Sequence, residues 1–394
     1  MLNSIKYKAS HWIRYNFIAK KLGFFELFSN SNKPEKQPDN LFTTSDGRDI
    51  PILNDYRYNL VPDWRGNNWL MTAYELLINN ILNKKDKRFF VEAFGTNSLA
   101  IPVQEFKDKI KQITPSISKY ILDGPVVKPS LGRISSRIQQ FYVHNSHLMK
   151  KLKDLGIQKF SNGMKLLEIG YSSGGYSLFA FDKLGFECHG VDNYYGSKSP
   201  NDSLPHFIKN QIKNSVRFSI GDICKTTPYP DNYFDIVFSA SVLEHITDIP
   251  AAFNEMRRIV KPNGTLVHGY NPFFCLNGGH KLGTLDSPWS HLRLSSEDLE
   301  RYIQKLRPLE IEISSAWNKH SLNRISTNQV QQELAKARLN VKLWEQHPTP
   351  KRLAEQITPE IFEEASHIYP SINYGDLISE VVFFIAQKSL WRYI

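Results

Sequence analysis

From about residue 162 onward, short apolar runs alternate with helix-like stretches, and this alternation restricts the fold more than any other feature. Each run has the length of a β-strand. The first five cover residues 164–169, 187–191, 215–220, 233–239 and 264–270. Strands that alternate with helices at this spacing form β-α-β units, in which neighbouring strands are parallel. The sequence therefore predicts an α/β domain built on an open, mostly parallel sheet.

Two more strands are expected further along the chain, at residues 309–314 and 380–387. The region between them, about 316–372, contains two helical patterns, near residues 328–343 and 350–367. We therefore interpret this region as a helical insertion before the last strand, inside an α/β domain that covers residues 161–394.

The part of the chain before the α/β domain divides into two. Residues 63–160 have mainly helical periodicity, notably over 134–155, which indicates a helical extension or cap. Residues 1–62 form a basic segment followed by a linker, where the tract 29–46 is rich in Asn, Ser, Lys and Pro and is expected to be an exposed loop.

The loop after the first strand is the strongest functional signal. The strand ends in Glu168-Ile-Gly170, four small or polar residues follow, and a helix is expected from about Gly175. Glycine permits a tight turn and close approach of a ligand to the backbone. The start of a helix offers unpaired N–H groups to a polar or anionic ligand. An ordinary strand–turn–helix junction and a dinucleotide-binding loop are the alternatives.

Polar residues also mark the ends of the next three strands. Asp192 closes the second strand, where a carboxylate accepts hydrogen bonds from ribose hydroxyls in nucleotide-binding α/β folds. Asp222 and Ile223 follow the third strand, and the alternative for Asp222 is a helix N-cap. Ser239 and Ala240 end the fourth strand at the sheet edge where ligands bind in open α/β folds.

Together these stretches resemble the class I S-adenosylmethionine-dependent methyltransferases, and among them the type-11 branch. The first family motif is Glu-x-Gly-x-Gly-x-Gly, which Glu168, Gly170 and Gly174 match, with Ser172 in place of the middle glycine. Leu-Glu-His at 243–245 and Lys-Pro-Asn-Gly at 261–264 also resemble the branch, with Asn for one glycine of its Pro-Gly-Gly turn. The resemblance covers about 110 of the 394 residues.

The resemblance implies a Rossmann-like sheet of seven strands with the last antiparallel, and S-adenosyl-L-methionine as the cofactor. By the same resemblance Asp192 binds the ribose, Asp222 reaches the adenine amino group, and Ile223 packs on the adenine ring. The full set of expected cofactor-binding residues is Glu168, Gly170, Tyr171, Ser172, Gly174, Asp192, Asn193, Asp222, Ile223, Ser239 and Ala240.

Residues for the chemistry on the methyl acceptor are expected after the fourth and fifth strands. His291 is the first candidate for a general base, His280 the second, and His245 the third. For His291 the alternative is that it caps a helix or stabilises its loop. For Arg293 we favour a structural salt bridge over substrate binding. No His, Cys and Asp residues have the spacing of metal ligands, so no metal is predicted.

The sequence therefore predicts a methyltransferase that acts on a small-molecule or glycan acceptor. A module that binds the cofactor or assembles a complex without catalysis is the main alternative, and a nicotinamide-linked oxidoreductase is a lesser one. The identity of the acceptor and the oligomeric state stay open.

Composition adds expectations about partners and location. Three widely spaced cysteines without a Cys-x-x-Cys motif fit a reducing cytoplasm. A net charge of +10 suits an anionic partner, although no nucleic-acid-binding module is recognisable. The basic, aromatic segment at residues 1–29 either packs on the protein itself, which we favour, or lies peripherally on a membrane surface. No apolar run reaches the roughly 18 residues that cross a bilayer.

Overall fold

The fold is known from a computed structural model. It describes residues 40–52, 130–171, 175–193, 204–212, 214–276, 278–280, 285, 287–306, 318–349 and 351–389. The predictions for residues 1–39 and 53–129, which include the basic aromatic segment and most of the helical extension, lie outside these residues. In the described part of the chain, no helix is both long and apolar enough to cross a membrane.

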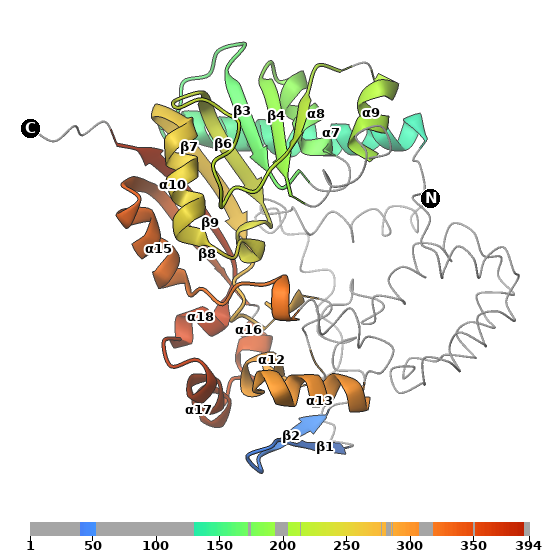
Figure 1. The fold of residues 1–394 in the computed structure, drawn as a ribbon, viewed down its shortest axis with the longest axis vertical. Coiled ribbons are helices and arrows are strands. Elements are labelled where there is room, and N and C mark those ends of the chain that lie inside the picture. Colours follow the sequence, from blue (N-terminus) through green and yellow to red (C-terminus); the bar gives the residue numbers. More distant parts are fainter. Residues whose placement is uncertain are drawn as a thin grey trace, which may run out of the picture.

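A seven-stranded sheet lies at the centre of the domain (Figure 1). Its strands are β3 (Lys165–Ile169), β4 (Glu187–Asp192), β5 (Arg217–Ile220), β6 (Phe234–Ala240), β7 (Val260–Tyr270), β8 (Leu339–Pro348) and β9 (Ser379–Lys388). The spatial order is β5-β4-β3-β6-β7-β9-β8, and the first five of these strands are parallel. The last strand, β9, is antiparallel to both β7 and β8. This topology confirms the predicted fold class.

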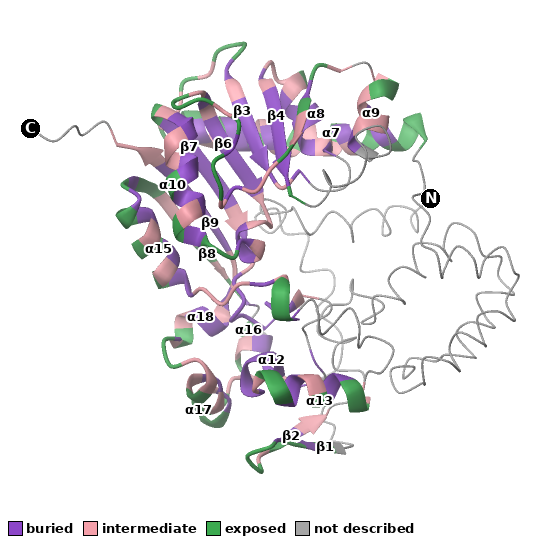
Figure 2. Ribbon diagram, viewed as in Figure 1, coloured by how far each residue is buried: buried purple, intermediate pink, exposed green. Residues whose placement is uncertain are grey.

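Helices cover both faces of the sheet. On one face pack α7 (Leu131–Asp154), α8 (Tyr176–Lys183) and α9 (Leu204–Ile212), and on the other α10 (Ile249–Ile259) and α15 (Thr327–Lys336). Leu166 of β3 packs with the first group, while Leu167 and Ile169 pack with the second. A strand that is buried on both faces reads as a continuous apolar run, which is why the central strands were visible in the sequence. Figure 2 shows these strands buried between the helices.

A second packed region lies beyond the carboxyl ends of the parallel strands (Figure 1). It consists of α12 (Ser290–Arg293), α13 (Ser296–Leu306), α16 (Lys351–Ala354), α17 (Pro359–Ile368), α18 (Tyr374–Ile378) and the hairpin β1 (Asn40–Thr43) and β2 (Asp49–Ile52). Helix α13 begins directly after Ser295, whose hydroxyl accepts a hydrogen bond from the Asp298 N–H at 3.1 Å.

The hairpin corrects part of the linker prediction. Residues 40–43 were expected in an exposed loop, but they form β1 and pair in antiparallel register with β2. Phe42 is buried against Tyr302 of α13, at a ring-centroid distance of 5.1 Å. The sequence did not indicate this strand, because the tract is polar and Phe42 is the one aromatic side chain of residues 40–43 that packs in the core.

The insertion also differs from its prediction, because residues 328–343 do not form one helix. Helix α15 ends at Lys336, and Arg338 adopts a left-handed backbone with φ 53°. The chain then enters β8, the sixth strand of the sheet in sequence order, whose hydrogen bonds to β9 override the helical pattern. The predicted strand at 309–314 lies outside the described residues. The second pattern, 350–367, forms two helices instead of one, α16 and α17.

Candidate functional site

The loop after β3 lies at the point where the strand order reverses, with β4 on one side of β3 and β6 on the other. Ligands of open α/β sheets bind in this crevice. Gly170 has φ 68°, and a Cβ atom there would lie 2.5 Å from Cγ2 of Val242. Its N–H donates to the Val191 carbonyl at 2.8 Å. Only glycine fits here, because the loops after β3 and β6 press against each other.

The start of α8 is packed as tightly as the Gly170 turn. Gly175 has φ 59°, and a Cβ atom there would lie 2.8 Å from the Phe218 ring. The ring of Tyr171 packs on Phe218 at 4.9 Å, and burial raises the pKa of the Tyr171 hydroxyl to about 12. The side chain of Tyr171 therefore supports the loop from inside. The other two predicted residues of this loop, Ser172 and Gly174, lie outside the described residues.

Glu168 is a buried carboxyl at the carboxyl end of β3. Burial raises its pKa to about 8, a hydrogen bond from Ser177 opposes this rise, and the negative charge of Asp192 adds to it. Within the described ranges its Oε2 atom has no hydrogen-bond partner. A buried acid beside a second acid suits a ligand that brings a cationic or hydrogen-donating group.

The remaining predicted cofactor residues lie along the same edge. Asp192 is buried at the end of β4, and Asn193 after it is exposed. The Asp222 carboxylate accepts a hydrogen bond from the Cys224 N–H at 2.9 Å and shapes the turn after β5. The side chain of Ile223 lies in the core beneath this turn.

At the end of β6, the Ser239 side chain forms a hydrogen bond within the sheet. The hydroxyl of Ser239 lies 2.6 Å from Nδ1 of His268, whose pKa burial lowers to about 3. Ala240 ends the strand. Because the Ser239 hydroxyl is engaged within the sheet, the backbone of these two residues is what β6 offers to a ligand at the edge.

Three residues from the loops after β6 and β7 meet next to this edge, and we call them the Glu244 cluster: Glu244, His245 and His280. Glu244 Oε1 lies 3.6 Å from Nε2 of His280, and the two imidazole rings are 5.3 Å apart. The side chain of Glu244 is 0% exposed. The prediction had named the two histidines but missed Glu244. Its signal was a charged residue in the short segment that follows β6, next to His245.

Residues of the segment 318–326 form hydrogen bonds to the backbone and to one ring of the Glu244 cluster. The Asn323 side chain donates to the carbonyls of Leu243 at 2.6 Å and Ile246 at 2.9 Å. These residues bracket the short 3₁₀ helix η6 (Leu243–His245). Nδ1 of His245 lies 2.5 Å from the Ser321 carbonyl. The insertion thus fixes the backbone and one ring of the cluster.

His291 has a different environment. It is buried, its Nε2 lies 3.1 Å from the Phe273 carbonyl, and its ring meets the Phe273 ring edge-on. Burial lowers its pKa to about 4. A neutral imidazole that hydrogen-bonds to a carbonyl stabilises the loop after β7, so the geometry favours His280 and His245 as groups that face an acceptor. Arg293 forms the expected structural salt bridge, with Glu364.

Two hollows lie in the region beyond the sheet. The first has a volume of about 400 Å³ and is lined by Ser296, Leu299, Glu300, Ile303, Asn318, Lys319 and Arg324. The guanidinium of Arg324 stacks on Phe273 at 4.7 Å, beside the loop that follows β7. This hollow therefore adjoins the loop after β7, and its charged lining residues are the Lys319–Glu300 ion pair and Arg324.

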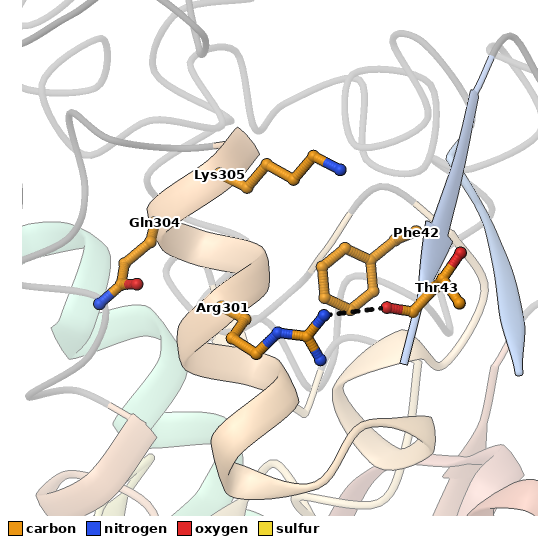
Figure 3. A pocket seen from close by; sticks show the side chains of 5 residues that line it. All are labelled: Phe42, Thr43, Arg301, Gln304 and Lys305. Atoms are coloured by element: carbon orange, nitrogen blue, oxygen red, sulfur yellow. Dashed lines mark hydrogen bonds between the residues drawn. The ribbon is translucent and has the colours of Figure 1, made fainter. Parts of the chain in front are cut away.

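The second hollow, of about 390 Å³, is lined by Phe42, Thr43, Arg301, Gln304 and Lys305 (Figure 3). Arg301 crosses it and donates to the Thr43 carbonyl at 3.3 Å. It lies between β1 and α13, away from the strand ends, so it is not part of the candidate site (Figure 1).

Known proteins with similar sequences include two phosphoethanolamine N-methyltransferases. Phosphoethanolamine N-methyltransferase 3 of Arabidopsis thaliana is 32% identical over 105 residues, which are 27% of this chain and 20% of that enzyme. Phosphoethanolamine N-methyltransferase 2 of Caenorhabditis elegans is 26% identical over 57% of this chain and 49% of that one. The matched part thus spans about a fifth of the plant enzyme and about half of the nematode enzyme.

A solved structure of phosphoethanolamine N-methyltransferase 2 of Haemonchus contortus, in complex with S-adenosyl-L-methionine, is also similar. It has 18% identity and a TM-score of 0.37, over 80% of this chain and 60% of that one. Residues 167–268 match a family model described as "Methyltransferase domain". This range begins in β3 and ends in β7, and it contains the Gly170 loop, Asp192 and Asp222. Residues 167–268 thus match the methyltransferase domain, as the sequence motifs predicted.

Proposed function

We propose that this chain is an S-adenosyl-L-methionine-dependent methyltransferase that acts on a small-molecule or glycan acceptor. One observation carries the proposal. Two buried acids, Glu168 at the end of β3 and Asp192 at the end of β4, lie beside the left-handed Gly170 turn at the switch point of the sheet. The sequence of this part of the sheet matches the methyltransferase domain. An acidic edge of this kind suits the ammonium group and the ribose hydroxyls of the cofactor.

In this proposal Glu168 faces the methionine ammonium of the cofactor, and Asp192 accepts hydrogen bonds from the ribose. Tyr171, Ser172 and Gly174 are proposed to contact the methionine part, and Asn193 the ribose. Asp222 and Ile223 contact the adenine. Ser239 and Ala240 contribute their backbone at the end of β6, because the Ser239 hydroxyl is engaged by His268.

The acceptor is proposed to bind on the side of the Glu244 cluster. Methyl transfer needs the nucleophile held in line with the sulfonium and, for a hydroxyl or amine, a group that receives its proton. His280 and His245 are the residues proposed to engage the acceptor's nucleophilic atom, and His291 to hold their loop in place. In the adjoining hollow Lys319 is paired with Glu300, so Arg324 is the cation there that favours an acceptor with an anionic group. The relatives named above are, by name, enzymes for a phosphate-bearing amine.

Calorimetric titration with S-adenosyl-L-methionine tests the cofactor. We expect micromolar affinity for the unchanged chain and loss of measurable binding for Asp192→Ala. The matched control is Asp231→Ala, which removes an aspartate at an exposed surface position and should bind as the unchanged chain does. Absence of binding to the unchanged chain would refute the proposal.

Incubation with labelled cofactor and a cell extract then tests catalysis. Transfer of the label to a small molecule or glycan is the expected result. Cofactor binding without any transfer would instead indicate a module that binds the cofactor without catalysis.

A further inference from the structure

We propose that the Glu244 cluster is a binding site for one divalent transition-metal ion, with Zn²⁺ as the best match. Glu244, His245 and His280 would be its three protein ligands. The role of such an ion in engaging the acceptor rests on the proposed function, whereas the binding of the ion itself does not. With an ion bound, His245 and His280 would reach the acceptor through the ion and would not receive its proton.

The donor set and its spacing fit a metal site. One carboxylate oxygen and two imidazole nitrogens lie within 4.8 Å of one another. Two histidines and one glutamate are a ligand set of catalytic Zn²⁺ sites, which keep a fourth position open for water or substrate. At Zn–ligand distances near 2.1 Å, tetrahedral geometry separates the ligand atoms by about 3.4 Å. The 3.6 Å between Glu244 Oε1 and His280 Nε2 is close to this value.

Glu244 also carries an unsatisfied oxygen. Its Oε1 receives the Asn271 N–H at 3.4 Å, but its Oε2 has no hydrogen-bond partner among the described residues. The side chain is fully buried. A buried carboxylate oxygen without a donor is costly, and a cation bound beside it would compensate for this cost.

The tautomer of His245 is the one that a metal needs. The Ser321 carbonyl can only accept a hydrogen bond, so Nδ1 of His245 carries the proton, and in the neutral ring Nε2 is then the nitrogen that can bind a metal. Hydrogen bonding of one ring nitrogen to a backbone carbonyl is the usual way in which proteins orient a metal-binding histidine. Asn323 holds the backbone of the same turn, so two ligands of the site are fixed in place by the insertion.

The simpler reading is an ion pair between Glu244 and a protonated His280. That pair accounts for the 3.6 Å contact, but it gives no role to the orientation of His245. The two readings differ in one measurable respect, since only a metal site binds a single equivalent of a divalent ion through all three side chains.

The test is titration of the metal-stripped full chain with Co²⁺, which reports tetrahedral coordination by intense visible absorption. We expect one equivalent of Co²⁺ per chain, displaced by Zn²⁺. Glu244→Gln keeps the side-chain shape, and His280→Asn keeps a residue that tolerates the φ of 55° at this position. Each should weaken binding by at least the roughly 10–100-fold that loss of an outer-shell partner costs.

The matched control is His367→Gln, which removes an exposed histidine of α17 and should bind as the unchanged chain does. No tetrahedral Co²⁺ spectrum in the unchanged chain, or equal affinity in both cluster variants, would overturn the proposal. If the variants do not fold, the stoichiometry and spectrum of the unchanged chain decide. Titration of the same preparations with S-adenosyl-L-methionine separates the two hypotheses, because a failed metal site leaves cofactor binding intact and a failed function does not.

Discussion

Replacement of Glu168 by Gln should make the protein more stable at alkaline pH. The carboxyl is buried at the end of β3, and its pKa is raised from 4.5 to about 8. The folded chain therefore binds more protons than the unfolded chain between these two pH values. Stability from this group is fully present below pH 4.5 and is lost as the pH rises through about 8. Gln is neutral and nearly the same shape, so Glu168→Gln lacks this dependence.

The magnitude follows from the two pKa values. A tenfold change in proton affinity corresponds to about 1.36 kcal/mol, so the whole effect is about 5 kcal/mol of folding free energy. About 4 kcal/mol of it falls between roughly pH 5 and pH 9. Urea unfolding of both proteins across this range measures the effect, because other titrating groups cancel in the difference between them.

The free energies of unfolding of the two proteins should diverge steadily as the pH rises. Curves that run parallel from pH 5 to 9 would mean that Glu168 is solvated or paired in the folded chain, and the reasoning would be refuted. Saturating S-adenosyl-L-methionine should reduce the divergence, since an ammonium group beside Glu168 favours the ionised form.

Three other changes test separate parts of the site. Gly170→Ala places a Cβ atom against Val242 in a left-handed turn, and calorimetry should detect at least a tenfold loss of cofactor affinity. Asn323→Ala removes two hydrogen bonds beneath η6 and should lower the free energy of unfolding in urea by about 2 kcal/mol. Arg324→Met should raise the KM of an anionic acceptor about tenfold, with cofactor affinity unchanged; equal KM values would remove Arg324 from the acceptor site.

The parallel part of the fold could be predicted because its signals are local. Strands β3 to β6 are short runs, and in β7 the Pro-Asn-Gly turn at residues 262–264 marks the start of the apolar run that pairs with β6. Asn263 has φ 60°, as expected for a residue that replaces a glycine in such a turn. Strand β8 was not predicted, because its conformation depends on pairing with β9 and not on its own residues.

The candidate site divides in the same way. The cofactor edge could be predicted because its acids Glu168, Asp192 and Asp222 each lie within two residues of the end of a strand. The Glu244 cluster could not, because it combines a turn after β6, a loop after β7 and a carbonyl from the insertion. For His291 the sequence left a loop-stabilising role open but could not show its partner, the Phe273 carbonyl, since backbone carbonyls carry no sequence signal.

The position of β9 has a consequence for the order in which the sheet assembles. Strands β3 to β7 pair with strands made shortly before or after them, so their part of the sheet can form while the chain is being synthesised. Strand β8 is made before β9, yet among the described strands it pairs with β9 alone. Until residues 376–388 have been made, β8 lacks its partner strand, and Thr327, next to the segment 318–326, lacks the Asp376 carboxylate to which its N–H and hydroxyl donate. The proposed acceptor side of the site is therefore completed after the strands of the proposed cofactor edge.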